Sequence, residues 1–438
     1  MKDLKKIIYS KNFALFFYLL FFSLSIYLFE FHLLVNSFDY FWCVDVKKDF
    51  SLPLFQNIKL PIHCDEGPYF SASTDIQYFF SNNNPYQKRP LWILLIASIN
   101  FLLESFFSSH ITEYQIIRIS FFFSQLILLF TVSKLFIIYL GLKLNKLSEY
   151  LPLTALLLFP NIRWNILFPS HENLTILAMV MSLLVLSSKN KSLLENNGTY
   201  IIFGVLVLAH RSFLIYGFLI IFYQFFLKKK IKIFAKNFLF LISPYIAFEI
   251  LLATASLESY DWNKSNFKQF YWIFDVIRGK ETFNSNNFCQ TFKTFYKCNF
   301  EITYNYLKYF IIMLMFVVLL LAFINTSNRN YEFELKNLVY LTIGIYLFWS
   351  LQGWYPPYRF INYSLGYFMV MLFMTCVESL KIKKNIAYLS LIFYFMSVGY
   401  LEPYSKNSLE LNFFNLISLL LFVFYLFNMY KSKTVYRD

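Results

Sequence analysis

Two adjacent carboxylates, Asp65 and Glu66, stand near the start of a polar stretch, Cys64–Leu91, that lies between long apolar segments. Lys88 and Arg89 precede a proline near its other end. A carboxylate can take a proton from an attacking group while cations stabilise a departing phosphate. The stretch therefore predicts a group-transfer site, with Asp65 as the base and Glu66 as second choice. A solvated acidic turn is the simpler alternative.

Composition excludes a soluble globular protein. Hydrophobic residues make up 58% of the 438 positions and charged residues make up 15%. The sequence therefore predicts an all-α polytopic membrane protein with about 11–12 transmembrane helices. The net charge of +14 lies largely in short basic runs beside apolar segments. That placement follows the positive-inside rule, so we interpret the charge as a topology signal and not as a nucleic-acid surface.

The N-terminal segments set the sidedness. Met1–Lys11 is basic and the apolar run Phe13–Val35 follows it, which predicts a retained span with a cytoplasmic N-terminus. The next apolar run, Leu91–Phe107, would invert every later basic loop if it crossed the membrane. It is short and contains Glu104, so we predict a juxtamembrane helix that lies along the outer surface.

Later apolar segments alternate with basic loops on the cytoplasmic side. Tyr200–Leu227 is too long for one span and has His210 and Arg211 at its middle, which predicts two short helices that dip into the membrane and return. Both termini are predicted to be cytoplasmic. The other predicted spans are about 115–138, 150–167, 173–187, 238–255, 304–324, 337–351, 360–377, 386–401 and 412–430.

Cysteine positions agree with this sidedness. Cys43 and Cys64 share the first predicted outer loop, Cys289 and Cys298 share the second, and Cys376 lies alone in a span. Two local disulfides on an oxidising side are one interpretation, although four cysteines allow three connectivities. Free thiols are the other. Zinc is disfavoured because neither loop has closely spaced cysteines.

Further charges fall on the predicted outer side of the membrane. Each one alone is explained by snorkelling from a helix end, but together they favour a cavity that faces outward, because charges at membrane depth are costly. Arginines beside tyrosines suit a sugar phosphate whose lipid tail stays in the bilayer. The residues concerned are Arg118, Arg163, Glu172, Arg211, Tyr358 and Arg359.

The order of these features resembles the C-type (GT-C) glycosyltransferase superfamily, notably protein O-mannosyltransferases and lipid A aminoarabinose transferases. The resemblance covers roughly residues 12 to 255. It lies in Asp65 and Glu66 followed by Tyr69, in the RPL segment at Arg89, and in the strings IIRISFFFSQ, RWNILFPSHENLTIL and AHRSFLIYGF. It implies inverting transfer of a sugar from a polyprenyl-phosphate donor on the outer face. Asp65 would be the base, and Arg89 and Arg211 would hold the donor phosphate.

The predicted substrate-binding set also takes in Tyr69, Lys88, His171 and His210. The chain departs from the family where relatives usually carry an aspartate after the third span, because it has His171-Glu172-Asn173 there. We divide it into a catalytic module at 1–255 with an outer loop at 37–114, a second outer loop at 256–303, and C-terminal helices at 304–438. The second loop matches no family pattern.

The sequence thus predicts a cell-envelope glycosyltransferase in a bacterial inner or plasma membrane, acting on a glycan, lipid or protein acceptor. A polysaccharide polymerase or ligase would place its key residues in the loop 256–303. A transporter would need a carboxylate deep within several spans, and the sequence offers little of that kind. No cofactor is required, although a divalent metal at Asp65 and Glu66 stays open.

Overall fold

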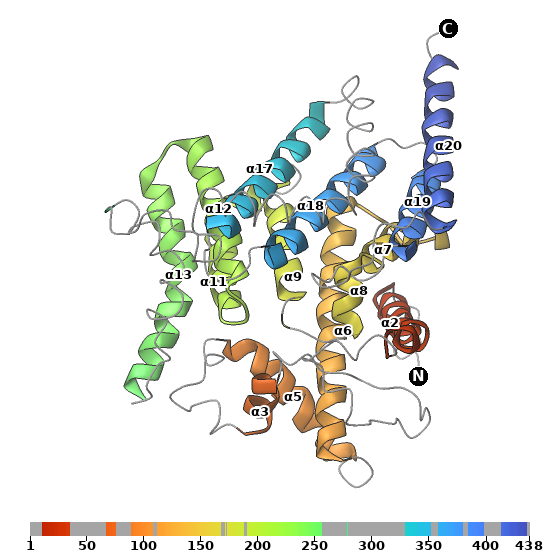
Figure 1. Cartoon of the computed structure of the whole chain (residues 1–438). Helices are drawn as coiled ribbons and strands as arrows, with labels where there is room; N and C mark the ends of the chain where they lie inside the picture. Colours follow the sequence, from red (N-terminus) through yellow and green to blue (C-terminus); the bar gives the residue numbers. More distant parts are fainter. Residues whose placement is uncertain are drawn as a thin grey trace, which may run out of the picture. The chain divides into compact units, whose positions relative to one another are not determined.

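The structure is a computed structural model, and every regular element in the residues that it describes is a helix (Figure 1). The all-α prediction is confirmed for this part of the chain. The predicted span at 304–324 lies outside it. The described residues are 11–35, 67–75, 89–107, 112–167, 171, 173–187, 191–255, 278, 329–351, 358–379, 384–397 and 413–435.

The helices follow the predicted apolar segments closely. They are α2 (Lys11–Val35), α3 (Gly67–Thr74), α5 (Pro90–Phe107), α6 (Glu113–Leu140), η4 (Leu147–Tyr150), α7 (Leu151–Leu157), α8 (Pro160–Leu167), α9 (Asn173–Leu186), α10 (Lys191–Glu195), α11 (Asn197–Val207), α12 (Ser212–Lys228), α13 (Ile231–Thr254), α17 (Arg329–Leu351), α18 (Tyr358–Ser379), α19 (Lys384–Ser397) and α20 (Phe413–Val435).

Prolines explain several helix starts. Pro90 opens α5 and Pro160 opens α8, where a residue without an N–H costs nothing because the first helical N–H groups have no partner in the helix. The predicted span at 150–167 is not one continuous helix, since the chain breaks at Leu158–Phe159 between α7 and α8. Pro160 cannot continue the hydrogen-bond pattern of α7, which is the physical reason for the break.

The chain divides into two compact units. The first comprises Met1–Tyr139, Ile162–Val185 and Asn190–Tyr260. In this unit α11, α12 and α13 pack against one another, and the prediction of two helices joined at His210–Arg211 is confirmed by α11 and α12. α13 begins at Ile231, earlier than the predicted 238, because no proline or glycine interrupts its basic first turns.

Glycines allow α11 and α12 to approach α13 closely. A Cβ added to Gly204 of α11 would lie 2.3 Å from the Leu241 carbonyl oxygen and 2.9 Å from Cδ of Pro244. A Cβ added to Gly217 of α12 would lie 2.7 Å from Cδ1 of Leu241. Small residues at such contacts permit tight packing of apolar helices.

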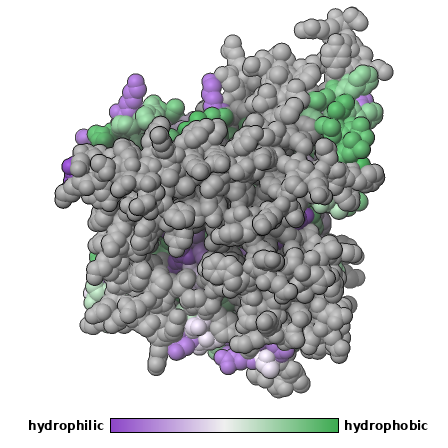
Figure 2. Space-filling model, viewed as in Figure 1, coloured by the Kyte–Doolittle hydropathy of each residue, from purple (hydrophilic) through white to green (hydrophobic). Residues whose placement is uncertain are grey.

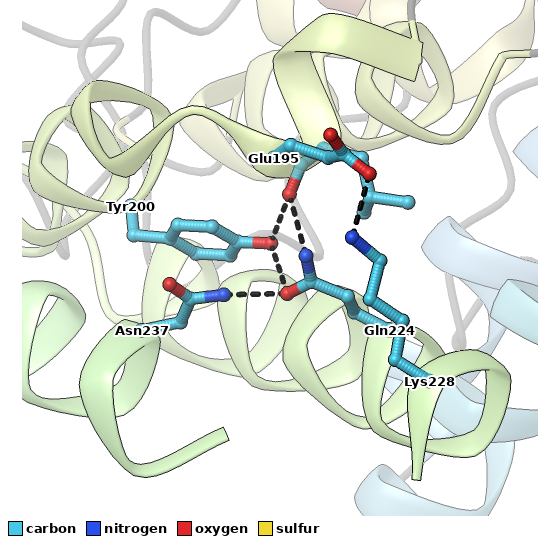
Figure 3. Close-up of polar contacts among 6 residues, drawn as sticks. Glu195, Tyr200, Gln224, Lys228 and Asn237 are labelled. Atoms are coloured by element: carbon cyan, nitrogen blue, oxygen red, sulfur yellow. Dashed lines mark hydrogen bonds and ion pairs between the residues drawn. The ribbon is translucent and has the colours of Figure 1, made fainter. Parts of the chain in front are cut away.

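A buried polar network joins the start of α11, the end of α12 and the first part of α13 (Figure 3). The Tyr200 hydroxyl lies 2.8 Å from the Leu194 carbonyl oxygen and 3.1 Å from Gln224 Oε1, so its one hydrogen is shared between two acceptors. Gln224 Nε2 donates to the same carbonyl at 3.1 Å, and Asn237 Nδ2 donates to Gln224 Oε1. The network fixes the end of α10 against α12 and α13.

Three described helices are long and apolar enough to cross a membrane: Pro90–Phe107, Gln115–Leu140 and Ile231–Thr254. α13 exposes large apolar side chains such as Leu239, Ile246 and Ile250, as expected of a surface in contact with lipid. The first of the three, α5, is the helix that we predict to lie along the outer surface. Its length and composition also suit a span, so its surface placement stays a prediction.

The second unit comprises Leu140–Asn161, Leu186–Lys189 and Asp261–Asp438. In it α19 packs on α20 and α7, and α17 packs on α18. Glu378 accepts hydrogen bonds from the Tyr388 hydroxyl and from Lys384 Nζ, each at 2.8 Å, which ties the end of α18 to α19. α20 presents an apolar face, visible as the hydrophobic patch at the upper right of Figure 2.

Candidate functional site

The site begins where two helix ends meet in the first unit. The first N–H groups of α5 and the last carbonyls of α11 have no partner within their own helices. The Leu91 amide, at the start of α5, donates to the Leu208 carbonyl, just past α11, at 3.2 Å. This backbone bond holds Arg89, which precedes α5, beside the turn that carries His210 and Arg211.

The start of α9 is fixed to the same region by side chains. Asn173 Nδ2 donates to Gln125 Oε1 of α6 at 2.6 Å, and both residues are buried. Two residues further on, the Thr175 and Ser212 hydroxyls lie 2.9 Å apart and connect α9 to the first residue of α12. His171, which precedes α9, is thereby placed near the turn between α11 and α12.

α3 completes the site because it packs on α5. Arg89 Nη1 donates to the hydroxyl of Tyr69, and the guanidinium carbon lies 5.9 Å from the centre of the Tyr69 ring. The Tyr69 ring lies 5.1 Å from that of His171, which lies 5.4 Å from that of His210, measured between ring centres. We call Tyr69, Arg89, His171 and His210 the Arg89 cluster.

The cluster is cationic. Arg89 is partly buried, and within the described part of the chain no carboxylate pairs with it. Burial lowers the pKa of His210 well below its ordinary value, and the neighbouring charges of Arg89, His171 and Arg211 lower it further. The His210 imidazole is therefore uncharged near neutral pH. A guanidinium held in place by a phenol, with imidazoles beside it, is suited to bind an anion with several oxygens.

Three other predicted arginines also belong to the first unit: Arg118, Arg163 and Arg211. Arg211 is the N-cap residue of α12 and is partly buried next to His210. Arg118 on α6 is 3% exposed and Arg163 on α8 is 4% exposed. Snorkelling to water does not explain such buried guanidinium groups. The contacts that define the Arg89 cluster do not include Arg118 or Arg163.

Several predicted residues lie outside the described part of the chain. They are Asp65, Glu66, Lys88 and Glu172 of the site and Cys43, Cys64, Cys289 and Cys298 of the predicted disulfides. In sequence, Asp65 and Glu66 directly precede Gly67, the first residue of α3. The backbone of Tyr358 and Arg359 opens α18 of the second unit, and their side chains are not described.

No set of three His, Cys, Asp or Glu residues within the described ranges lies close enough together to hold a metal ion. Asp65 and Glu66 lie outside these ranges, so the metal that the sequence leaves open there is untested.

Sequence reasoning missed the residues that hold the cluster in place: Gln125, Asn173, Thr175 and Ser212. Asn173 and Ser212 are polar residues at helix starts, which is a recognisable capping signal. Gln125 is a polar residue inside an apolar helix, where an amide usually needs a partner.

No family model, curated protein or solved structure matches this chain.

Proposed function

We propose that the chain is a membrane glycosyltransferase of the GT-C type, which transfers a sugar from a polyprenyl-phosphate donor to an acceptor on the outer face of the membrane. The observation that carries the proposal is Arg89, a partly buried guanidinium that is held by Tyr69 and has no carboxylate partner among the described residues. Such a group suits a donor phosphate. The predicted spans and the order of motifs around Asp65 supply the rest.

In the proposed reaction the acceptor hydroxyl loses its proton to Asp65, with Glu66 as the second choice. The acceptor oxygen forms a bond to the anomeric carbon from the face opposite the phosphate, and the bond from that carbon to the phosphate oxygen breaks. Its electron pair leaves with the phosphate, so the configuration at the anomeric carbon inverts. Arg89 and Arg211 stabilise the leaving phosphate, which is the larger electrostatic task.

The test compares variants in a membrane assay with polyprenyl-phosphate sugars, after envelope glycans with and without the protein have identified the sugar. Asp65→Asn keeps the shape of the side chain and removes a base, so transfer should be lost while donor binding persists. Arg89→Ala should weaken donor binding as well, by roughly 10- to 150-fold, because a phosphate loses a charge-assisted partner worth about 1.5–3 kcal/mol.

Arg278→Ala is the matched control, because Arg278 is exposed and lies in the predicted loop 256–303. It should leave both binding and transfer unchanged. Wild-type turnover by Asp65→Asn and by Glu66→Gln would refute the first-loop mechanism. Loss of activity in Arg278→Ala with normal activity in Arg89→Ala would instead favour a polymerase or ligase that works through the later loop.

A further inference from the structure

His210 has one ring nitrogen fixed and the other available. Its Nδ1 accepts a hydrogen bond from the Ser212 amide at 3.3 Å. That amide is the first N–H of α12, which lacks a partner within the helix. Because Nδ1 must present a lone pair to this N–H, the proton of the imidazole is on Nε2.

Nε2–H of His210 has no hydrogen-bond acceptor among the described residues. The Ser212 amide binds Nδ1, and the ring of His171 lies tilted beside that of His210. The side chain is only 2% exposed. The Nε2–H therefore has little contact with water, and it gains a hydrogen bond when a ligand brings an acceptor. The groups around the ring are Arg89, Arg211, His171 and, beyond His171, Tyr69. A ligand that binds beside this ring therefore enters a cationic environment.

We propose that His210 binds the phosphate group held at Arg89 by donating Nε2–H to one of its oxygens, with Ser212 acting as the positioning residue that sets the tautomer. This role rests on the phosphate-binding part of the proposed function and adds to it. The role needs no proton transfer: His210 is neither the acid nor the base of the reaction. If Nδ1 were protonated, its N–H and the Ser212 N–H would both be donors. The hydrogen bond that orients the ring would then be lost.

The alternative is a histidine that only fills space beside His171. The two roles differ in whether Nε2–H donates a hydrogen bond. In glutamine the side-chain amide nitrogen can take the place of Nε2, whereas in asparagine the shorter side chain places it near Nδ1. His210→Gln should therefore keep phosphate affinity within about threefold, and His210→Asn should lose about tenfold, the ratio expected for one hydrogen bond to a charged group. A space-filling role predicts instead that His210→Leu, which fills a similar volume but has no N–H, keeps phosphate affinity as well as His210→Gln does.

The experiment uses the full chain in detergent micelles with ¹⁵N-labelled histidine. The signals missing in His210→Gln identify His210 in the wild-type spectrum, which should show an unprotonated Nδ1 and a protonated Nε2 at pH 7. Polyprenyl monophosphate should shift the Nε2 signal saturably. Inorganic phosphate in the same micelles tells whether the phosphate group alone suffices or the lipid is required, and a saturable shift with either supports the proposal.

An imidazolium or a proton on Nδ1 at pH 7 would overturn the proposal, as would equal affinities of the Gln and Asn variants or the absence of any shift with both probes. Its failure can be told apart from that of the proposed function. If phosphate binds through Nε2 but the protein transfers no sugar, the glycosyltransferase proposal fails and the role of His210 stands. If the protein transfers sugar and His210→Asn keeps wild-type donor affinity, the role of His210 fails and the glycosyltransferase proposal stands.

Discussion

Gly204→Ala tests the packing that supports the site. The new Cβ would stand 2.3 Å from the Leu241 carbonyl oxygen and 2.9 Å from Cδ of Pro244, whereas real Cβ contacts under 3.0 Å essentially do not occur. Neither neighbour can rotate away, since one is backbone and the other is a proline ring. α11 and α13 must therefore separate until the closest contact grows from 2.3 Å to at least 3.0 Å.

The expected cost follows from two opposing terms. Overpacking of this kind costs about 1–3 kcal/mol, and replacing glycine by alanine in a helix gains up to about 1 kcal/mol. The net destabilisation should reach about 2 kcal/mol. Gly198→Ala is the matched control in the same helix, because its Cβ would meet only the flexible Asn196 side chain, at 3.2 Å. Gly217→Ala should fall between them, since the end of the Leu241 side chain can move.

The assay is denaturant unfolding of the full chain in one detergent, followed by intrinsic fluorescence, with the free energy of unfolding compared across the three variants. We expect Gly204→Ala to be the least stable and Gly198→Ala the most stable. Should Gly204→Ala match or exceed the stability of Gly198→Ala, α11 and α13 are not in close contact at Gly204 and the reasoning is wrong.

Three further predictions concern the same unit. Gln224→Leu should cost about 1–3 kcal/mol of unfolding free energy, because it leaves the Asn237 amide without its buried acceptor, while the Tyr200 hydroxyl keeps the Leu194 carbonyl. Lys228→Ala should change stability little in the same unfolding assay, since its ion pair is exposed. The pKa of His210 is lower in the folded chain than in the unfolded chain, so on acidification the unfolded chain binds a proton first. The free energy of unfolding should therefore fall as the pH drops below about 6.5. Unfolding curves from pH 8 to 5 should show this loss, and His210→Gln should reduce it.

The sequence predicts most helices well, because long apolar runs between basic loops leave little choice of structure. The turn at His210–Arg211 was predictable from charge placed inside an apolar run. The break before Pro160 was missed although its signal is local, since the residue before a proline is biased away from the helical conformation.

All four residues of the Arg89 cluster belong to the predicted substrate-binding set, but their contacts with one another were not predicted. Arg89 and His210 stand out as polar residues next to apolar segments, but nothing in their spacing shows that they meet. Their approach depends on the Leu91–Leu208 backbone bond between helix ends that are far apart in the sequence. Backbone atoms carry no residue-type signal, and for that reason a pairing of this kind cannot be read from one sequence.

That same bond extends the Gly204 prediction from stability to binding. Gly204 lies one turn before Leu208, so a displaced α11 should also displace the carbonyl that positions Arg89. Gln224 lies about 18 Å along α12 from Ser212. Well below both unfolding midpoints, Gly204→Ala should therefore weaken polyprenyl-phosphate binding while Gln224→Leu leaves it near wild type, even at similar losses of stability. Equal affinities in the two variants would mean that the α11 end does not position Arg89.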